Sequence, residues 1–209
     1  MSTSSLDSTT PKQKVSRLGA AILRGGLFRF LPFRQTFIKL AFQDTNLNGI
    51  DLKGGNLRGV YLPRANLEKA NLSAVDMREA YLLYSNFAMV DGRKADFRGA
   101  SLTLANFSNA NFREADFRGA DLRAAKFNRA DFSKANFSGA NLELARLNTS
   151  NFSEANLSGA NLHWVNPSGV NLEGANVENT RFISGFGWSL NEMEDLKQRG
   201  AIFEDPPSD

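Results

Sequence analysis

The sequence predicts an all-β solenoid, and three observations support this fold class. Every fifth residue from Phe42 to Phe182 is apolar or nearly so, and Leu or Phe fills most of these positions. Ala is the commonest residue two places before each of these positions. Asp, Asn, Ser and Gly are frequent at the three remaining positions of each five-residue unit. No insertion shifts this register. Because a period of five matches neither a helix nor a strand, each unit must be a short extended piece followed by a bend.

The register also predicts which side chains lie inside. Side chains alternate along extended backbone, so the apolar residue and the Ala two places before it face the same side. The three other residues face solvent or form the bend, where Asp, Asn, Ser and Gly tolerate turn geometry. A single unit cannot bury its Leu or Phe, whereas stacked coils give each large side chain a neighbour above and below. We therefore expect the apolar and Ala columns to fill a narrow tube.

Segments such as Ala105-Asn106-Phe107 and Ala135-Asn136-Phe137 have the form Ala-(Asp/Asn)-(Leu/Phe)-x-x. In this motif the sequence resembles the pentapeptide-repeat family over about two-thirds of the chain. The resemblance implies a right-handed quadrilateral β-helix with about 20 residues per coil. About seven coils would then form a rod roughly 35 Å long. The closing segment LKQRGAIFED is similar to those of short cyanobacterial and plastid members of the family.

The composition predicts four segments along the chain. They are a disordered Ser/Thr-rich N-terminus (1–13), a basic amphipathic N-terminal cap with helical pieces (14–41), the pentapeptide-repeat β-helix (42–183) and a C-terminal helix and strand cap with an acidic tail (184–209). Residues 1–43 hold seven basic residues and one acidic residue, whereas residues 184–209 hold two basic and six acidic residues. The charge is therefore polarised along the chain.

The C-terminal segment shows the expected signs of a short helix. Ser189 and Glu192 match a capping box, and Gly200 is placed to end the helix near Arg199. We expect this helix and the following strand to close the last coil around Phe186 and Trp188. The family resemblance also implies a possible homodimer through such a terminal helix.

The N-terminal segment alternates basic residues with large apolar ones. The residues in question are Arg24, Phe28, Arg29, Phe30, Phe33, Arg34, Phe37 and Lys39. No apolar stretch approaches the roughly 20 residues that span a bilayer. The segment could cap the exposed first coil, or it could attach to an anionic membrane surface or a membrane protein complex, and the two roles are compatible. The start has no secretory signal pattern, so we expect a cytoplasmic protein, either free or peripheral on the cytoplasmic side of a thylakoid-type or other membrane.

Stacking residues 20 positions apart separates the sequence into four faces, and one of them has unusual outward residues. These are Tyr61, Tyr81, Leu83, Tyr84, Leu104, Leu144, His163 and Trp164. Outward positions on a repeat rod should be polar, so an apolar and aromatic strip indicates a binding surface or a surface covered by the chain's own termini.

The neighbouring face carries a column of arginines at 20-residue intervals. The column consists of Arg58, Arg78, Arg98 and Arg118. Tyr, Trp and Arg are enriched where protein interfaces concentrate their binding energy, so this edge is a candidate protein-binding site. The alternative interpretation is that the arginine stems cover the coil while Asp and Glu neighbours neutralise them.

The sequence favours a non-enzymatic protein. It has no nucleophile with a plausible base, no phosphate-binding loop and, in a filled tube, no cleft for a substrate. It has no Cys and one His, so we expect no metal and no cofactor.

We expect a scaffold, assembly or adaptor factor that binds an unidentified protein partner. Two alternatives involve nucleic acid: a DNA mimic that regulates a type II topoisomerase, as the family resemblance allows, and a weak nucleic-acid binder through the arginine column. The near-neutral charge of residues 44–183, with 16 basic and 15 acidic residues, counts against both.

Overall fold

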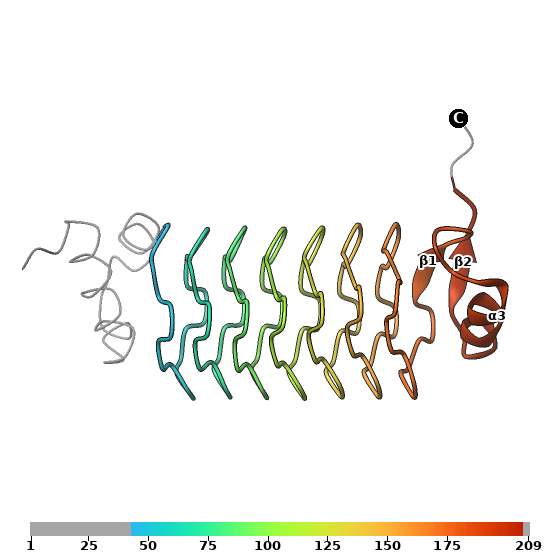
Figure 1. The fold of residues 1–209 in the computed structure, drawn as a ribbon. Helices are drawn as coiled ribbons and strands as arrows, with labels where there is room; N and C mark the ends of the chain where they lie inside the picture. Colours follow the sequence, from blue (N-terminus) through green and yellow to red (C-terminus); the bar gives the residue numbers. More distant parts are fainter. Residues whose placement is uncertain (1–42, 207–209) are drawn as a thin grey trace, which may run out of the picture.

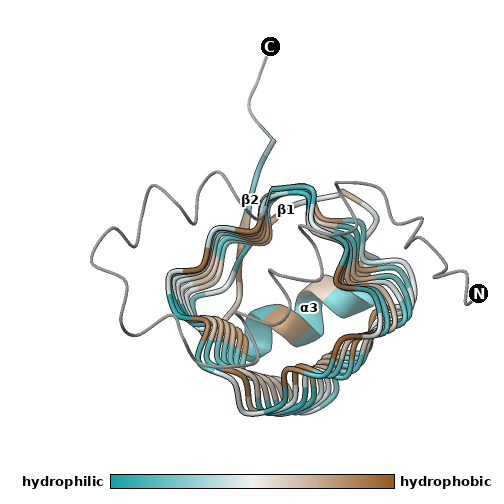
Figure 2. Ribbon diagram, turned by 90° about the vertical axis from the view of Figure 1, so that its left-hand side faces the viewer, coloured by the Kyte–Doolittle hydropathy of each residue, from teal (hydrophilic) through white to brown (hydrophobic). Residues whose placement is uncertain are grey.

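The computed structural model describes residues 43–206, which form a rod of stacked coils with a helix at its C-terminal end (Figure 1). Parallel bridges join residues 20 positions apart, from the Asn46–Asn66 pair to the Asn161–Arg181 pair. Viewed along the rod, the coils overlie one another in a four-sided outline (Figure 2). The coil therefore repeats every 20 residues, as the family resemblance implied.

Each five-residue unit contains one bridged residue, one buried apolar residue and a tight turn. At Leu62, the backbone N–H donates to the carbonyl of Tyr81 in the next coil at 2.8 Å. The N–H of Ala65 then closes the turn by donating to the carbonyl of Leu62 at 3.3 Å. The third turn residue, Arg64, has a φ of 56°, and its equivalents in the other units are also positive. This backbone is that of a type II turn, which a five-residue repeat can continue without a break.

Most units have an Asn or Asp directly before the apolar residue, and its side chain holds the turn that follows. The backbone N–H of Asn48 donates to Oδ1 of Asn46 at 3.1 Å, and the same bond recurs between Ser108 and Asn106 at 3.1 Å. In this column the amide side chains also bond to one another, as Asn106 donates to Asn86 at 3.0 Å. The regular Asn and Asp positions are therefore structural, because they supply the acceptor that the turn lacks.

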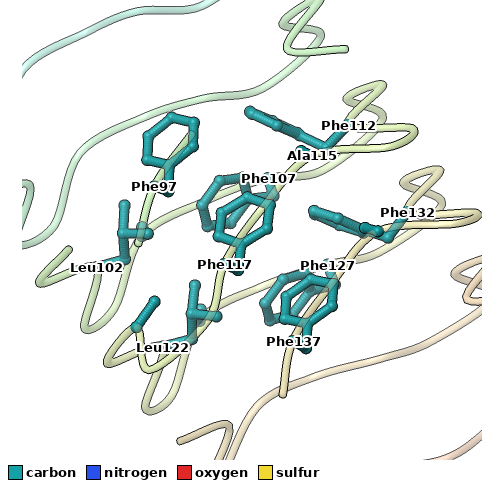
Figure 3. Packing of buried hydrophobic residues seen from close by; sticks show 14 of the residues in the cluster. Phe97, Leu102, Phe107, Phe112, Ala115, Phe117, Leu122, Phe127, Phe132 and Phe137 are labelled. Carbon is teal, nitrogen blue, oxygen red and sulfur yellow. The ribbon is translucent and has the colours of Figure 1, made fainter. Parts of the chain in front are cut away.

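Three columns of stacked phenylalanines fill the middle of the tube (Figure 3). The columns are Phe87, Phe107 and Phe127; Phe97, Phe117 and Phe137; and Phe112, Phe132 and Phe152. Within a column the rings are nearly parallel, with centroids 4.9 Å apart for Phe117 and Phe137. Rings from different columns meet edge to face, as Phe107 and Phe112 do at 5.2 Å. Both arrangements are favoured by aromatic pairs, and all these side chains are buried.

The register has one glycine among its apolar positions, and the packing explains it. A Cβ built on Gly92 would lie 2.1 Å from Cε1 of Phe112 in the next coil. The Phe112 ring therefore occupies the space that a side chain at position 92 would need. Glycine at position 92 therefore leaves room for the large Phe112 side chain in the same column, which keeps the core closely packed.

The C-terminal end consists of β1 (Arg181–Ile183), α3 (Leu190–Gln198) and β2 (Ile202–Glu204). The predicted capping box forms, since Ser189 and Glu192 each bond to the backbone of the other. The last helical residue is Gln198, Arg199 is the C-cap, and Gly200 follows with a φ of 89°. β2 then pairs in parallel with β1, so the chain adds one more strand to the last coil.

These elements bury the apolar end of the last coil. The Phe203 ring stacks on Phe182 with centroids 5.1 Å apart, and buried Trp188 meets Phe182 edge to face at 5.1 Å. The Arg199 guanidinium donates to the carbonyls of Leu172 and Ala175, which ties the end of the helix to the last coil. Figure 2 shows α3 lying across this end of the tube. The expectation for Phe186 was wrong, because its side chain is 44% exposed and lies outside this cluster.

Candidate protein-interaction surface

We define the tyrosine face as the outer surface of the side whose interior holds the column from Leu62 to Leu162. Its outward apolar residues are Tyr61, Tyr81, Leu83, Tyr84, Leu104, Leu144 and Trp164. Tyr81, Tyr84 and Leu144 are exposed over 54%, 56% and 56% of their surface. Leu83 and Leu104 are also exposed, whereas Tyr61 and Trp164 are half-buried. The structure thus places an apolar and aromatic surface on the outside of the rod.

The residues of the tyrosine face form two groups along the rod. In the first, the rings of Tyr61 and Tyr81 are 6.0 Å apart, and the N–H of Tyr84 donates to the carbonyl of Thr103 beside Leu104 at 3.0 Å. In the second, Leu144 lies one coil before Trp164, whose ring meets Phe186 edge to face at 5.5 Å.

Phe186 is a part of this surface that sequence reasoning assigned elsewhere. It lies after β1, where the five-residue register has ended and no longer predicts which side chains face outward. In extended backbone Phe186 and Trp188, two residues apart, would face the same side, so the sequence pattern does not separate them. The positive φ of Gly187, 78°, interrupts extended backbone between the two side chains.

The backbone at the corner of the tyrosine face is unfavourable for the residues that occupy it. Tyr84, Leu104 and Leu144 have φ values of 59°, 61° and 61°, and Trp164 has 58°. A left-handed conformation costs a residue with a Cβ roughly 1–2 kcal/mol, which glycine avoids. At Tyr84, Leu104 and Leu144 the side chains are also exposed to water, so folding does not explain bulky apolar residues in a turn that glycine would fit better.

We define the arginine face as the adjacent outer surface, over the interior column from Leu57 to Val177. Arg78 donates to both carboxylate oxygens of Asp76 and lies 3.6 Å from Asp96 in the next coil. Arg98 pairs with Asp96 and Asp116 in the same way. Arg118 pairs with Asp116, and Arg58 pairs with Glu79. The column is therefore a ladder of alternating charge, in which each arginine has a carboxylate partner.

The ion pairs shift the pKa of several carboxylates. The hydrogen bond from Arg78 lowers the pKa of Asp76 below its usual value. For Asp96, burial raises the pKa, but the hydrogen bonds from Arg98 and the nearby guanidinium charges outweigh it, so that its pKa is also lowered. These aspartates therefore stay ionised below the pH at which an isolated Asp is protonated.

The structure places the two sets of residues on adjacent faces without joining them into one cluster. Arg78, Arg98 and Arg118 each follow an Asp by two residues and bond back to it, so their guanidinium groups are held by the coil's own aspartates. Arg58 follows Asn56 instead and pairs with Glu79. Neutralisation by Asp and Glu neighbours is the alternative interpretation of this column, and the ion pairs agree with it. The recurring Asp-x-Arg pattern at Asp76, Asp96 and Asp116 is the sign of this pairing in the sequence.

Several predicted residues lie outside the residues that the structure describes. They are Arg24, Phe28, Arg29, Phe30, Phe33, Arg34, Phe37 and Lys39 of the N-terminal segment. Within residues 43–206, no helix is both long and apolar enough to cross a membrane. In the same range, no group of three or more His, Cys, Asp or Glu side chains could hold a metal ion.

Comparison with known families identifies the repeat. Eight copies of the family described as pentapeptide repeats match residues 42–78, 70–109, 93–129 and 130–169, which is more than half of the chain. The chain belongs to the pentapeptide-repeat family. Membership implies a right-handed quadrilateral β-helix, in agreement with the four-sided outline in Figure 2. No protein with a curated description matches this pentapeptide-repeat chain significantly.

Solved structures similar to this pentapeptide-repeat chain come from several sources. A pentapeptide repeat protein of Nostoc Pcc 7120 is 31% identical, with 54% of this chain and 87% of that protein covered and a TM-score of 0.44. Trypsin-treated QnrB1, a plasmid-mediated fluoroquinolone resistance protein, is 23% identical, with 77% and 86% covered and a TM-score of 0.48. A thylakoid-lumen pentapeptide repeat protein of Arabidopsis thaliana is 24% identical, with 74% and 81% covered and a TM-score of 0.21.

Proposed function

We propose that this protein is a non-enzymatic scaffold or assembly factor that binds a protein partner through the tyrosine face. The observation that carries the proposal is the set of large apolar side chains at Tyr84, Leu104 and Leu144, which are exposed and held at positive φ. Burying them against a partner would remove apolar surface from water and offset the backbone cost. The arginine face, already neutralised by its own aspartates, would flank this contact and help fix its orientation.

A pull-down from the native cell tests the tyrosine face. The test variant combines Tyr81→Ala, Tyr84→Ala and Leu144→Ala, which removes three exposed side chains without touching the core. The matched control combines Lys94→Ala, Glu114→Ala and Lys134→Ala on the opposite side of the coil, where Lys94 pairs with Glu114 at 3.6 Å and Lys134 with Glu154 at 3.3 Å. We expect the control to recover the partner and the test variant to lose it. Equal recovery by both variants would refute the proposal.

We further propose that the basic N-terminal segment, residues 14–41, brings the rod to an anionic membrane or membrane complex on the cytoplasmic side. The support is its composition, since bases alternate there with aromatic and aliphatic residues. Co-sedimentation with vesicles containing anionic lipid should depend on residues 1–40 and weaken at high salt. Equal sedimentation of the chain with and without these residues would remove this part of the proposal.

A further inference from the structure

A second surface of the rod carries arginines that lack the partners seen elsewhere. Among the arginines of residues 43–206, Arg129 and Arg146 form no ion pair with another described residue, whereas all the others do. Both are exposed, and they lie on the side of the coil that carries the column of bonded asparagines. On this protein, an arginine without a carboxylate is the exception and needs a physical reason.

The two arginines line the same shallow hollow, with a volume of about 550 Å³. The N–H of Arg129 donates to the carbonyl of Asn148 at 3.1 Å, which joins its coil to the one that holds Arg146. The remaining lining residues are amides and hydroxyls, including Asn109, Asn128 and Asn148, and no Asp or Glu is among them. The hollow therefore presents hydrogen-bond donors and positive charge without a competing carboxylate.

The hollow lies where the asparagine column is interrupted. Lys126 and Arg146 take the places after Asn106, and they bridge each other directly in adjacent coils. Like charges facing each other across neighbouring strands destabilise a sheet. Asn at these two positions would have continued the amide ladder, as Asn86 and Asn106 do. Lys126 and Arg146 thus replace hydrogen-bonded amides with two neighbouring positive charges. This arrangement is unfavourable unless an anion lies between the two side chains.

The interruption also leaves two backbone donors without partners. In the other coils of this column, the side chain of the Asn accepts the N–H two residues later, as Asn106 does from Ser108. Lys126 and Arg146 have no acceptor oxygen, and within residues 43–206 nothing accepts the N–H of Asn128 or Asn148. Because the equivalent N–H groups point at an outward Asn side chain, these two donors face the outer surface beside the guanidinium groups.

We propose that this hollow binds a phosphate group, either as free phosphate or as a phosphomonoester. Guanidinium groups bind phosphate through paired, charge-assisted hydrogen bonds, and outward backbone N–H groups supply further donors for its oxygens. Two guanidinium groups match the double negative charge of phosphate better than the single charge of a carboxylate. Binding would relieve the repulsion between Lys126 and Arg146. The site shares no residue with the tyrosine face.

An NMR titration of the full-length chain tests the proposal. At constant ionic strength, inorganic phosphate and, in a second arm, O-phosphoserine should cause saturable shifts of the Asn128 and Asn148 amide signals. The variant R129Q/R146Q should bind at least about tenfold more weakly. The control R93Q, which removes an arginine paired with Asp91 at 2.7 Å, should bind as the wild type does. Saturation in one arm alone would assign the source of the phosphate group.

Two results would overturn the proposal. The first is an unsaturated response of the wild type in both arms, which would indicate general ionic screening. The second is equal affinity of the wild type and R129Q/R146Q, measured after circular dichroism has shown that the variant is folded.

Discussion

The tyrosine face and the arginine face have the same turn backbone but place different kinds of residue on it. At the corner of the arginine face, glycine occupies most of the positive-φ positions, as at Gly99 and Gly119, whereas Tyr84 and Leu104 occupy the same positions on the tyrosine face. On the arginine face each charge is neutralised by an Asp or Glu, and on the tyrosine face apolar side chains lie in water. One face therefore agrees with the local rules of the repeat and the other violates them. Departures from local rules are expected at functional or strained sites, and this makes the tyrosine face the candidate binding surface.

The largest effect that separates the two faces should be on partner binding. Replacing Tyr84 and Leu144 with Asp places charges in the centre of the proposed interface and should weaken binding by at least about 30-fold, the size of a hot-spot loss. Replacing Arg78 and Arg98 with Gln should change the affinity less than about threefold, because both arginines are engaged by their own aspartates. Titration calorimetry with the recovered partner measures both. A larger loss from the arginine variant would reverse the ranking of the faces.

A smaller effect, in the opposite direction, should appear in stability. Tyr84→Gly relieves the positive φ of 59° and should raise the free energy of unfolding by about 0.5 kcal/mol, after the greater flexibility of glycine in the unfolded chain is subtracted. Gly139→Tyr on the arginine face, at a φ of 66°, should lower it by a similar amount. Urea unfolding measures both variants. If Tyr84→Gly destabilises the rod, the tyrosine ring contributes to packing. The exposed residues of the tyrosine face would then be explained in part by folding.

The smallest effect should come from the charge ladder. Asp76→Asn keeps an acceptor for the backbone N–H of Arg78 but removes the ion pair, and should lower Tm by no more than about 2 °C at pH 7. Since the folded-state pKa of Asp76 is lowered, its stabilisation is fully present above about pH 4 and is lost as the pH falls further through the folded pKa. Below pH 4 the difference between the variant and the wild type should shrink. A difference that persists in acid would mean that the carboxylate acts through packing rather than charge.

Much of the fold follows from the sequence because the register is free of insertions. The alternation around Leu62 and Phe107 predicts which side chains are buried, and the pair Ser189 and Glu192 predicts where α3 begins. The reason for Gly92 could not be predicted, since it depends on the direction in which the Phe112 ring turns. Periodicity specifies which column a side chain belongs to but not its rotamer.

The candidate surfaces were predictable only in part. The column at Arg78 and Arg98 was visible at once, but its partners were not, because Asp96 and Glu79 both lie near it and side-chain geometry decides between them. The hollow at Arg129 and Arg146 was missed for a related reason. The hollow stands out because its two arginines form no ion pair with a described residue. That difference can be recognised only after the ion pairs of all the other described arginines are known.

The unbroken stacking of coils fixes the distance between any two residues of one column along the rod. Tyr84 and Leu144 belong to the same corner column, and each coil between them adds one strand spacing of about 4.8 Å. Deleting residues 105–124 would remove one complete coil, preserve the register on both sides and bring the two contact groups closer by that single step. A partner that contacts both groups at once would lose one of them, whereas a partner that contacts one group would not respond. Deleting whole coils one at a time therefore measures the distance between contact groups that a partner requires, in steps of one strand spacing.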